Sequence, residues 1–223
     1  MTDPVVEARA RLSGGTSGGP IYRAVAASLL GRATGGTLLD VGCGTGALRG
    51  HVAAQFGRYV GADAVRYSGF PEGDEFHPID LDTGRVPVPD GFADVVTAIE
   101  VIEHLENPRQ FARELSRLAR PGGWVVVSTP NQLSLLSKLT LLALNEFNAF
   151  RAGSYPAHLS ALLEVDLRRI AAECGWVDVC VRYTASGRVP GVRWHWPRWL
   201  SRLAPRALSD NVLLVARKPG GGG

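Results

Sequence analysis

One run of nine residues, LLDVGCGTG at 38–46, limits the fold of this chain more than any other stretch. The run starts as a short strand, continues through three glycines at alternate positions, and leads into a helical pattern from Ala47. Glycine adopts positive φ angles and has no Cβ to hold a ligand away from the backbone. A glycine turn between a strand and a helix N-terminus therefore predicts a slot for a nucleotide-like ligand.

Strand-like and helix-like segments alternate on both sides of this turn, with short connections between them. This order predicts an α/β fold with a doubly wound, Rossmann-like sheet of seven strands, most of them parallel. The expected strands are 37–41, 59–62, 75–79, 93–99, 124–129, 176–183 and 212–216. The expected helices are 21–30, 47–56, 108–120, 133–150 and 165–174, with Pro121-Gly122-Gly123 ending the third of them.

The length of 223 residues fits a single domain over residues 1–223. Residues 1–20 finish in a stretch rich in glycine and serine, and we expect them to form a flexible lead-in. Residues 132–160 and 187–209 fall outside the strand–helix alternation. We expect these two segments to be insertions on the substrate side of the molecule, or a lid over it.

Charge and cysteine content exclude several classes of protein. The formal net charge of +3 is too small to predict a nucleic-acid partner. Cys43, Cys174 and Cys180 lack the spacing of a metal site, and their odd number argues against a disulfide framework. The start of the chain has no secretory signal pattern, and no apolar run reaches the length of a spanning helix. Together these features predict a cytoplasmic protein.

Acidic residues follow the predicted strands where a nucleotide-like ligand needs hydrogen-bond acceptors. Asp63 lies 21 residues after Gly42, the place from which an acid accepts hydrogen bonds from two ribose hydroxyls. Asp80 and Leu81 suit an adenine, because the carboxylate can accept from the exocyclic amine while leucine packs on the ring. Glu100 ends the fourth predicted strand. Since the carboxyl ends of parallel strands meet at one edge, all these residues should lie together.

The glycines alone do not separate this chain from a dinucleotide-binding dehydrogenase. Gly42, Gly44 and Ala47 satisfy G-x-G-x-x-G/A, which is the fingerprint of that class. Two features favour a different ligand. Asp40 stands before the first glycine, where its carboxylate can accept from an ammonium group, and Gly46 extends the motif to G-x-G-x-G.

With these features the chain resembles class I S-adenosylmethionine-dependent methyltransferases, close to the ubiquinone-biosynthesis O-methyltransferase type. The matching stretches are LLDVGCGTG (38–46), the acid at 63, IDL (79–81), FADVVTAIEVIEHLENP (92–108), LARPGGWVVVSTPN (118–131) and, more weakly, a last strand at 211–218. The resemblance implies that this last strand is antiparallel. It also implies S-adenosylmethionine as cofactor, with S-adenosylhomocysteine as product.

The resemblance also implies which residues hold the cofactor. The glycine turn and the acid before it would hold the methionine part, the acid at 63 the ribose, Asp80 and Leu81 the adenine, and Glu100 the sulfonium end. The implied cofactor-binding residues are Asp40, Gly42, Cys43, Gly44, Gly46, Asp63, Ala64, Asp80, Leu81 and Glu100.

Methyl transfer from a sulfonium needs alignment of the acceptor and, for a hydroxyl acceptor, removal of its proton. His104 follows the fourth predicted strand, and His158 lies where this family builds its acceptor pocket. We therefore take both histidines as candidate catalytic residues. The alternatives are a loop-fixing role for His104 and a packing or capping role for His158. The predicted activity is methylation of a hydroxyl on a small molecule such as a quinone precursor, a secondary metabolite or a glycan sugar.

Three further interpretations stay open. Glu100, Glu103, His104 and His158 could together ligate a divalent cation, as in relatives that use a metal to hold the acceptor hydroxyls. Metal-free relatives carry the same Glu-His pair, so a metal-free site is the expectation. A metal-dependent RNA 2′-O-methyltransferase is disfavoured because no basic stripe surrounds the catalytic face. A non-catalytic cofactor-binding module would need the same cofactor residues.

The substrate-side segments have their own patterns. Residues 133–150 are rich in leucine at helical spacing, and a lid helix is preferred over contact with a membrane or a lipid-linked substrate. Residues 188–207 combine Trp194, Trp196 and Trp199 with arginines and no acid. The preferred interpretation is that the tryptophans pack on the sheet edge. Peripheral membrane contact or a pocket wall are the alternatives. The sequence does not indicate the oligomeric state.

Overall fold

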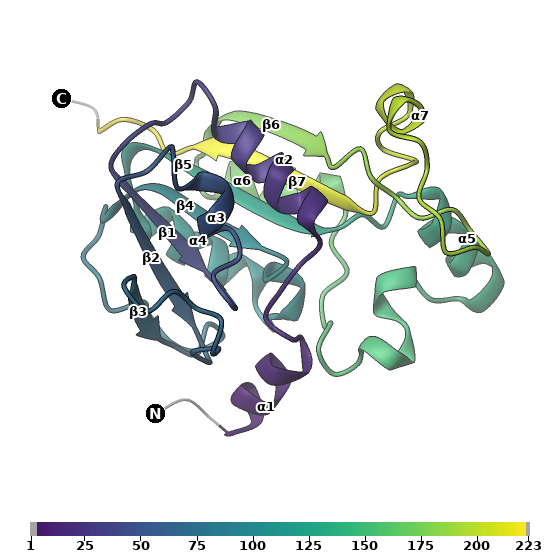
Figure 1. Cartoon of the computed structure of the whole chain (residues 1–223), viewed down its shortest axis with the longest axis horizontal. Coiled ribbons are helices and arrows are strands. Elements are labelled where there is room, and N and C mark those ends of the chain that lie inside the picture. The colour runs from purple at the N-terminus through teal and green to yellow at the C-terminus, as the bar shows by residue number, and fades with distance from the viewer. Residues whose placement is uncertain (1–3, 222–223) are drawn as a thin grey trace.

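The computed structural model describes residues 4–221 and has a twisted seven-stranded sheet at its centre (Figure 1). The strands are β1 (Thr37–Val41), β2 (Arg58–Asp63), β3 (Glu75–Pro78), β4 (Ala93–Ile99), β5 (Ala119–Pro130), β6 (Val177–Tyr183) and β7 (Asn211–Arg217). Their order across the sheet is β3-β2-β1-β4-β5-β7-β6. Only β7 runs against its neighbours, since it pairs antiparallel with both β5 and β6. The predicted fold class is thereby confirmed.

Helices cover both faces of the sheet. The α-helices are α1 (Pro4–Leu12), α2 (Gly19–Leu29), α3 (Arg49–Val52), α4 (Pro108–Leu118), α5 (Leu135–Leu144), α6 (Glu164–Glu173) and α7 (Arg198–Leu203). Short 3₁₀ turns lie at Ile102–His104, Asn148–Phe150 and Ala152–Ser154. α2 and α3 cover one face of the sheet, and α4 and α6 cover the other (Figure 1).

Adjacent strand residues divide the core between these two faces. Leu38 packs with α2 and α3, whereas Leu39 packs with α4 and α6. Val95 and Val96 on β4 divide in the same way. This follows from the two-residue period of a strand, and it explains why the central strands carry apolar side chains on both faces.

Three helices are shorter than the sequence-based prediction. α3 has four residues, where 47–56 was expected to be helical. α4 ends at Leu118 rather than at the Pro-Gly-Gly sequence, because Ala119 already pairs with Ala93 of β4 and Arg120 donates to Asp94 at 2.6 Å. α5 ends at Leu144, since Asn145 takes the left-handed conformation with φ 55°.

The start of the chain also differs from the expected flexible lead-in. Residues 1–3 lie outside the described range, and α1 forms from Pro4 onward. Two hydrogen bonds tie the following segment to the sheet edge: the Tyr67 hydroxyl donates to the Ala10 carbonyl at 2.6 Å, and the Thr45 amide donates to the Gly15 carbonyl at 2.8 Å. The segment therefore lies against the glycine turn.

None of the helices in the described part of the chain has both the length and the hydropathy that crossing a bilayer requires.

Candidate active site

The glycine turn after β1 is built so that only glycine fits. Gly42 and Gly44 have φ angles of +75° and +52°. A Cβ on Gly42 would lie 2.2 Å from a Val101 methyl carbon, and a Cβ on Gly44 would lie 2.0 Å from the Gly15 carbonyl oxygen. The turn therefore needs glycine both for its backbone conformation and because Val101 and Gly15 lie so close to it.

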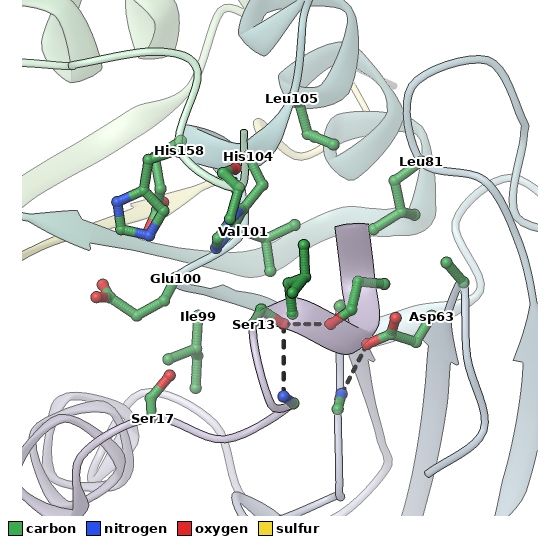
Figure 2. Close-up of a pocket in the computed structure, with 18 of the residues that line it drawn as sticks. Ser13, Ser17, Asp63, Leu81, Ile99, Glu100, Val101, His104, Leu105 and His158 are labelled. Carbon is green, nitrogen blue, oxygen red and sulfur yellow. Dashed lines mark hydrogen bonds between the residues drawn. The ribbon is translucent and has the colours of Figure 1, made fainter. Parts of the chain in front are cut away.

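A cavity of about 500 Å³ opens beside this turn at the carboxyl edge of the sheet (Figure 2). Eleven of the twelve site residues predicted from the sequence line it: Asp40, Gly42, Cys43, Gly44, Asp63, Ala64, Asp80, Leu81, Glu100, His104 and His158. Gly46 is not among the lining residues, because it faces Phe70 and Pro71 instead. Figure 2 shows that the cavity has two ends, with Asp63 and Leu81 at one and Glu100, His104 and His158 at the other.

Asp63 is held in place by the glycine turn itself. The Gly44 amide donates to the Asp63 carboxylate at 2.7 Å. Burial raises the pKa of Asp63 above its ordinary value, while this hydrogen bond and others from the backbone act to lower the pKa. The amide hydrogen bond thus fixes the direction of a carboxylate that borders the cavity.

Asp40 is almost fully buried and accepts two hydrogen bonds at its carboxylate oxygens. The donors are the Tyr59 hydroxyl and the Thr97 hydroxyl, each at 2.7 Å. Burial raises the pKa of Asp40 to about 6. Asp40 thus fixes the floor of the cavity beneath the glycine turn.

Asp80 stabilises a turn after β3. One of its oxygens accepts from the Asp82 amide at 2.9 Å and the other from the Thr83 hydroxyl at 2.8 Å. These bonds hold Leu81 in position at the cavity wall (Figure 2). The sequence placed Asp80 and Leu81 at this edge, although β3 itself ends at Pro78.

Glu100 occupies a strained position just beyond β4. Its φ of +55° is uncommon for a residue with a side chain and costs conformational energy. The Ser128 hydroxyl donates to one carboxylate oxygen at 3.2 Å, and the Asn211 amide group donates to the other at 2.7 Å. Burial raises the pKa of Glu100 to about 8, although both hydrogen bonds act to lower it.

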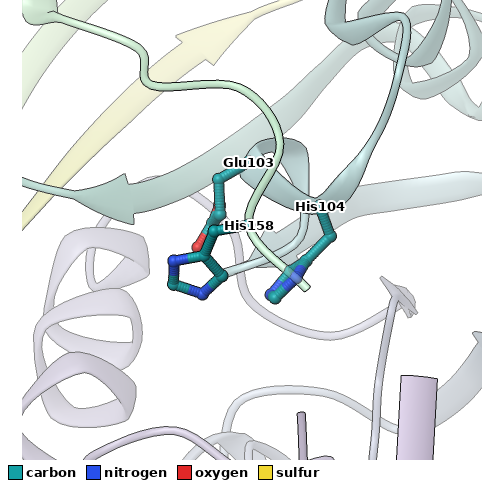
Figure 3. A group of neighbouring side chains, drawn as sticks. All are labelled: Glu103, His104 and His158. Atoms are coloured by element: carbon teal, nitrogen blue, oxygen red, sulfur yellow. The ribbon is translucent and has the colours of Figure 1, made fainter. Parts of the chain in front are cut away.

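Glu103, His104 and His158 form a compact group at the acceptor end (Figure 3). The two imidazole rings meet edge to face with centroids 4.7 Å apart. Nδ1 of His104 bonds to the Ala157 carbonyl at 2.7 Å, and Nδ1 of His158 bonds to the Ala149 carbonyl at 2.5 Å. A carbonyl accepts only from N–H, so each Nδ1 carries a proton, and in the neutral ring of His158 Nε2 carries the lone pair.

The Glu103 carboxylate in this group is fully buried, and no hydrogen bond of ordinary geometry reaches its oxygens within the described residues, although the Thr129 hydroxyl acts as a donor that lowers its pKa. Burial raises its pKa well above the ordinary value, and the neighbouring Glu100 raises it further. Ligand atoms from Glu103, His104 and His158 all lie within 4.8 Å of one another. A buried carboxylate beside two oriented imidazoles is a donor set that suits a divalent cation.

Two sets of lining residues were missed by the sequence analysis. Ser13, Gly15 and Ser17 line the main cavity from the segment after α1. The Ser17 amide donates to the Tyr22 hydroxyl at 2.8 Å, so α2 also fixes this segment. Only the glycine-rich composition of 13–19 pointed to close backbone approach here, and we interpreted it as flexibility. Asn211 was missed because a residue at the start of an antiparallel strand belongs to no motif.

A second cavity of about 320 Å³ adjoins the acceptor end and shares Glu100, Ser154 and His158 with the main cavity. Its other walls are mostly polar and come from the 130–137 segment, Asn148, Ala149, Arg188 and residues 210–211. Both expected substrate-side segments, 132–160 and 187–209, therefore contribute residues to this cavity.

Comparison with known proteins gives a consistent result. The family model described as a methyltransferase domain matches residues 20–181. A protein of Mycolicibacterium smegmatis with the name "Probable S-adenosylmethionine-dependent methyltransferase" is 33% identical over 216 residues, which cover 83% of this chain and 82% of that protein. A ubiquinone biosynthesis O-methyltransferase of Bordetella bronchiseptica is 35% identical over 115 residues. That match spans only 46% of either protein.

Solved structures support the fold. The crystal structure of an S-adenosylmethionine-dependent methyltransferase from Archaeoglobus fulgidus superposes with a TM-score of 0.58 at 19% sequence identity. The superposition covers 88% of this chain and 94% of that one. At this level of identity, the likeness concerns the architecture of the sheet and its helices.

Proposed function

The chain belongs to the methyltransferase domain family of S-adenosylmethionine-dependent enzymes, and we propose that it methylates a hydroxyl oxygen of a small molecule. The cofactor is S-adenosylmethionine, which supplies an activated methyl group on a sulfonium. The protein then has to align the acceptor and take up its proton. The two ends of the main cavity divide these tasks between cofactor binding and proton removal.

At the cofactor end, the residues fit the chemical groups of S-adenosylmethionine. The buried Asp63 carboxylate, oriented by the Gly44 amide, would accept hydrogen bonds from the ribose hydroxyls. Leu81 would pack on the adenine, and the Asp80 carboxylate would accept from its amine. Asp40 and the glycine turn would face the methionine part. Glu100, which borders the cavity on the histidine side, would line the sulfonium where the acceptor meets it. These assignments extend the family resemblance to positions that border one cavity.

At the acceptor end, the proposal depends on the hydrogen bonding and the pKa of His158. Its Nδ1–H donates to the Ala149 carbonyl, which leaves Nε2 as the basic nitrogen of the ring. Burial lowers the pKa of His158, so the ring is neutral near pH 7 and ready to accept a proton. The cofactor would supply the methyl group and leave as S-adenosylhomocysteine. His158 would take up the proton of the acceptor hydroxyl at Nε2, with His104 in contact with the same ring.

A labelled-methyl assay tests this proposal. The full chain is incubated with methyl-labelled S-adenosylmethionine and single small hydroxyl compounds: a catechol, a monophenol and a methyl glycoside. We expect label to appear as a methyl ether in at least one product, with equimolar S-adenosylhomocysteine. Label found on nitrogen or carbon instead would contradict O-methylation. Cofactor binding without transfer to any compound or to a cell extract would favour the cofactor-binding module.

A second candidate keeps the same reaction and adds a divalent cation at Glu103, His104 and His158. The buried Glu103 carboxylate favours it, because no hydrogen bond of ordinary geometry reaches its oxygens within the described residues and a buried carboxylate is costly unless a positive charge or a well-placed donor meets it. The cation would polarise the acceptor hydroxyl and lower its pKa. Calorimetric titration of the chelator-treated chain with Mg²⁺, Mn²⁺ or Zn²⁺ tests this candidate. Glu103→Gln should weaken any binding, and full activity with no metal binding after chelation would reject the cation.

A further inference from the structure

The helix α5 turns a polar residue toward the protein and leucines toward solvent, the reverse of an ordinary surface helix. Its buried residue is Ser137, whose hydroxyl donates to Gln132 and accepts from the Asn148 amide. Its exposed residues are mainly leucines: Leu135, Leu139, Leu141, Leu142 and Leu144. Leu142 has 84% of its surface exposed. A surface helix normally turns its apolar side toward the core, whereas α5 leaves more than half of the surface of Leu142 and Leu144 in solvent.

The segment 187–209, which includes α7, carries further large apolar side chains in solvent. Trp194 and Trp199 are 75% and 66% exposed, and Leu203 is 75% exposed. Packing of these two tryptophans on the sheet edge, the interpretation preferred from the sequence, is therefore wrong. The segment also contains five arginines and no acid. Among the described residues, no carboxylate forms an ion pair with Arg193, Arg198 or Arg202.

These two elements are joined and lie at the same end of the molecule (Figure 1). The Leu135 amide at the start of α5 donates to the Ala207 carbonyl at 2.7 Å. The Asn131 side chain donates to the carbonyls of Arg206 and Ser209, each at 2.8 Å. We call this surface the α5–α7 face and define it by Leu139, Leu142, Trp194, Trp199, Leu203 and the arginines at 193, 198 and 202.

The composition of the α5–α7 face indicates what covers it. Exposed leucines and tryptophans gathered at one end of a molecule mark an interaction site rather than ordinary surface. A protein partner would bury arginine only where it supplies carboxylates, whereas a bilayer accepts the whole set at once. Tryptophan rings suit the headgroup level, leucine enters the acyl boundary, and arginine extends to lipid phosphates. Each basic side chain adds attraction to an anionic surface.

We propose that the α5–α7 face docks the protein on the surface of an anionic lipid bilayer. The proposal does not depend on which atom accepts the methyl group. It places the second cavity, whose wall includes Ser134 and Ser137 of the α5 region, next to the bilayer surface. The spacing of charge and apolar side chains matches interfacial binding, in which no helix crosses the membrane.

Vesicle sedimentation of the full chain tests the proposal. Vesicles of phosphatidylcholine with one third phosphatidylglycerol should sediment the protein, and pure phosphatidylcholine vesicles should bind it at least tenfold less. The double variant Leu142→Ser/Trp199→Ser should bind the anionic vesicles at least tenfold more weakly. Arg198→Gln and Arg202→Gln should each weaken binding about fivefold, as one lost arginine contact predicts, and added salt should reduce these differences.

The matched controls lie elsewhere on the surface. Leu30→Ser removes a leucine that is 61% exposed at the end of α2, and Arg85→Gln removes an exposed arginine beside Asp90. Both should leave vesicle binding unchanged. Calorimetry with S-adenosylhomocysteine should give the same affinity for all variants, which verifies folding.

Absence of sedimentation with anionic vesicles would overturn the proposal, as would equal binding by the double variant. A dimer in light scattering that Leu142→Ser dissociates, without vesicle binding, would assign the α5–α7 face to a second copy of the chain instead.

Discussion

The two ends of the main cavity are held in place by different kinds of contact. At the cofactor end, Asp40 accepts hydrogen bonds from side chains of β2 and β4. Asp63 accepts a hydrogen bond from the backbone of the glycine turn. At the acceptor end, His104 and His158 come from segments 54 residues apart and are held by the loop carbonyls of Ala157 and Ala149. The first end has the rigidity of the sheet, whereas the second depends on how an insertion lies over it.

This difference implies separable effects. Changes at the cofactor end should alter cofactor affinity, and changes at the acceptor end should alter turnover alone. Gly44→Ala, His158→Ala and Asp63→Ala test this separation directly, whereas Asp40→Asn tests the burial of the acid beneath the glycine turn.

Gly44→Ala should have the largest effect. The added Cβ would overlap the Gly15 carbonyl oxygen at 2.0 Å and would also force alanine into a left-handed conformation. We expect no measurable cofactor binding by calorimetry. Gly50→Ala is the matched control, because a Cβ there meets nothing within 4 Å. Normal affinity in Gly44→Ala would show that the turn adapts and that the cofactor end is less rigid than its bonds suggest.

His158→Ala should reduce kcat about 10²- to 10⁴-fold, which is the usual contribution of a positioned base. Cofactor affinity should change by less than about twofold, because His158 lies at the opposite end of the cavity from Asp63 (Figure 2). Steady-state kinetics and calorimetry measure the two quantities on the same preparation. His77→Ala, on β3, is the control for loss of a histidine. Wild-type turnover in His158→Ala would remove this residue from the mechanism.

Asp63→Ala should show the converse behaviour. Loss of charged hydrogen bonds to the ribose should weaken cofactor binding by about 2–3 kcal/mol, or roughly 30- to 150-fold. At saturating cofactor the turnover should stay close to that of the wild type. Asp178→Ala, an exposed acid on β6, provides the comparison. An unchanged dissociation constant would refute the ribose assignment, and a loss of turnover at saturation would show that the two ends are coupled.

Asp40→Asn should have a smaller effect, visible in the pH dependence of stability. Burial raises the pKa of Asp40 to about 6, so between about pH 4 and pH 6 the folded chain binds more protons than the unfolded chain. The free energy of unfolding should therefore fall as pH rises through this window. Asparagine can still bond to Tyr59 and Thr97, and it should flatten this fall by about 1–2 kcal/mol. If the melting temperatures of the two proteins changed with pH in the same way, this would contradict a buried, titrating Asp40.

The sequence predicted that the residues of the cofactor end lie together, because the pattern that places them is local, while their roles toward the cofactor stay a prediction. A glycine motif, an acid at a set distance and apolar strands are all encoded within the first 131 residues, and strand ends of a parallel sheet meet at one edge without further information. The sheet order and the antiparallel β7 agree with the family resemblance.

The acceptor end was less predictable because its contacts join residues that share no motif. The pairing of Asn211 with Glu100 spans 111 positions, and the burial of Glu103 depends on what packs around it. The segment after α1 was missed for a similar reason. Its glycines were interpreted as flexibility, although Gly15 lets the backbone come close to Tyr67 and the glycine turn.

The reversed direction of β7 has a consequence for how this architecture can change. β6 ends and β7 begins at the same edge of the sheet, with Tyr183 paired to Val212, so the connection of residues 184–210 starts and finishes beside the cavities. The closure entropy of such a loop rises only with the logarithm of its length, by about 0.6 kcal/mol for each doubling. Inserted residues there can therefore remodel the acceptor surface at small thermodynamic cost, while the register of the sheet and the glycine turn stay as they are.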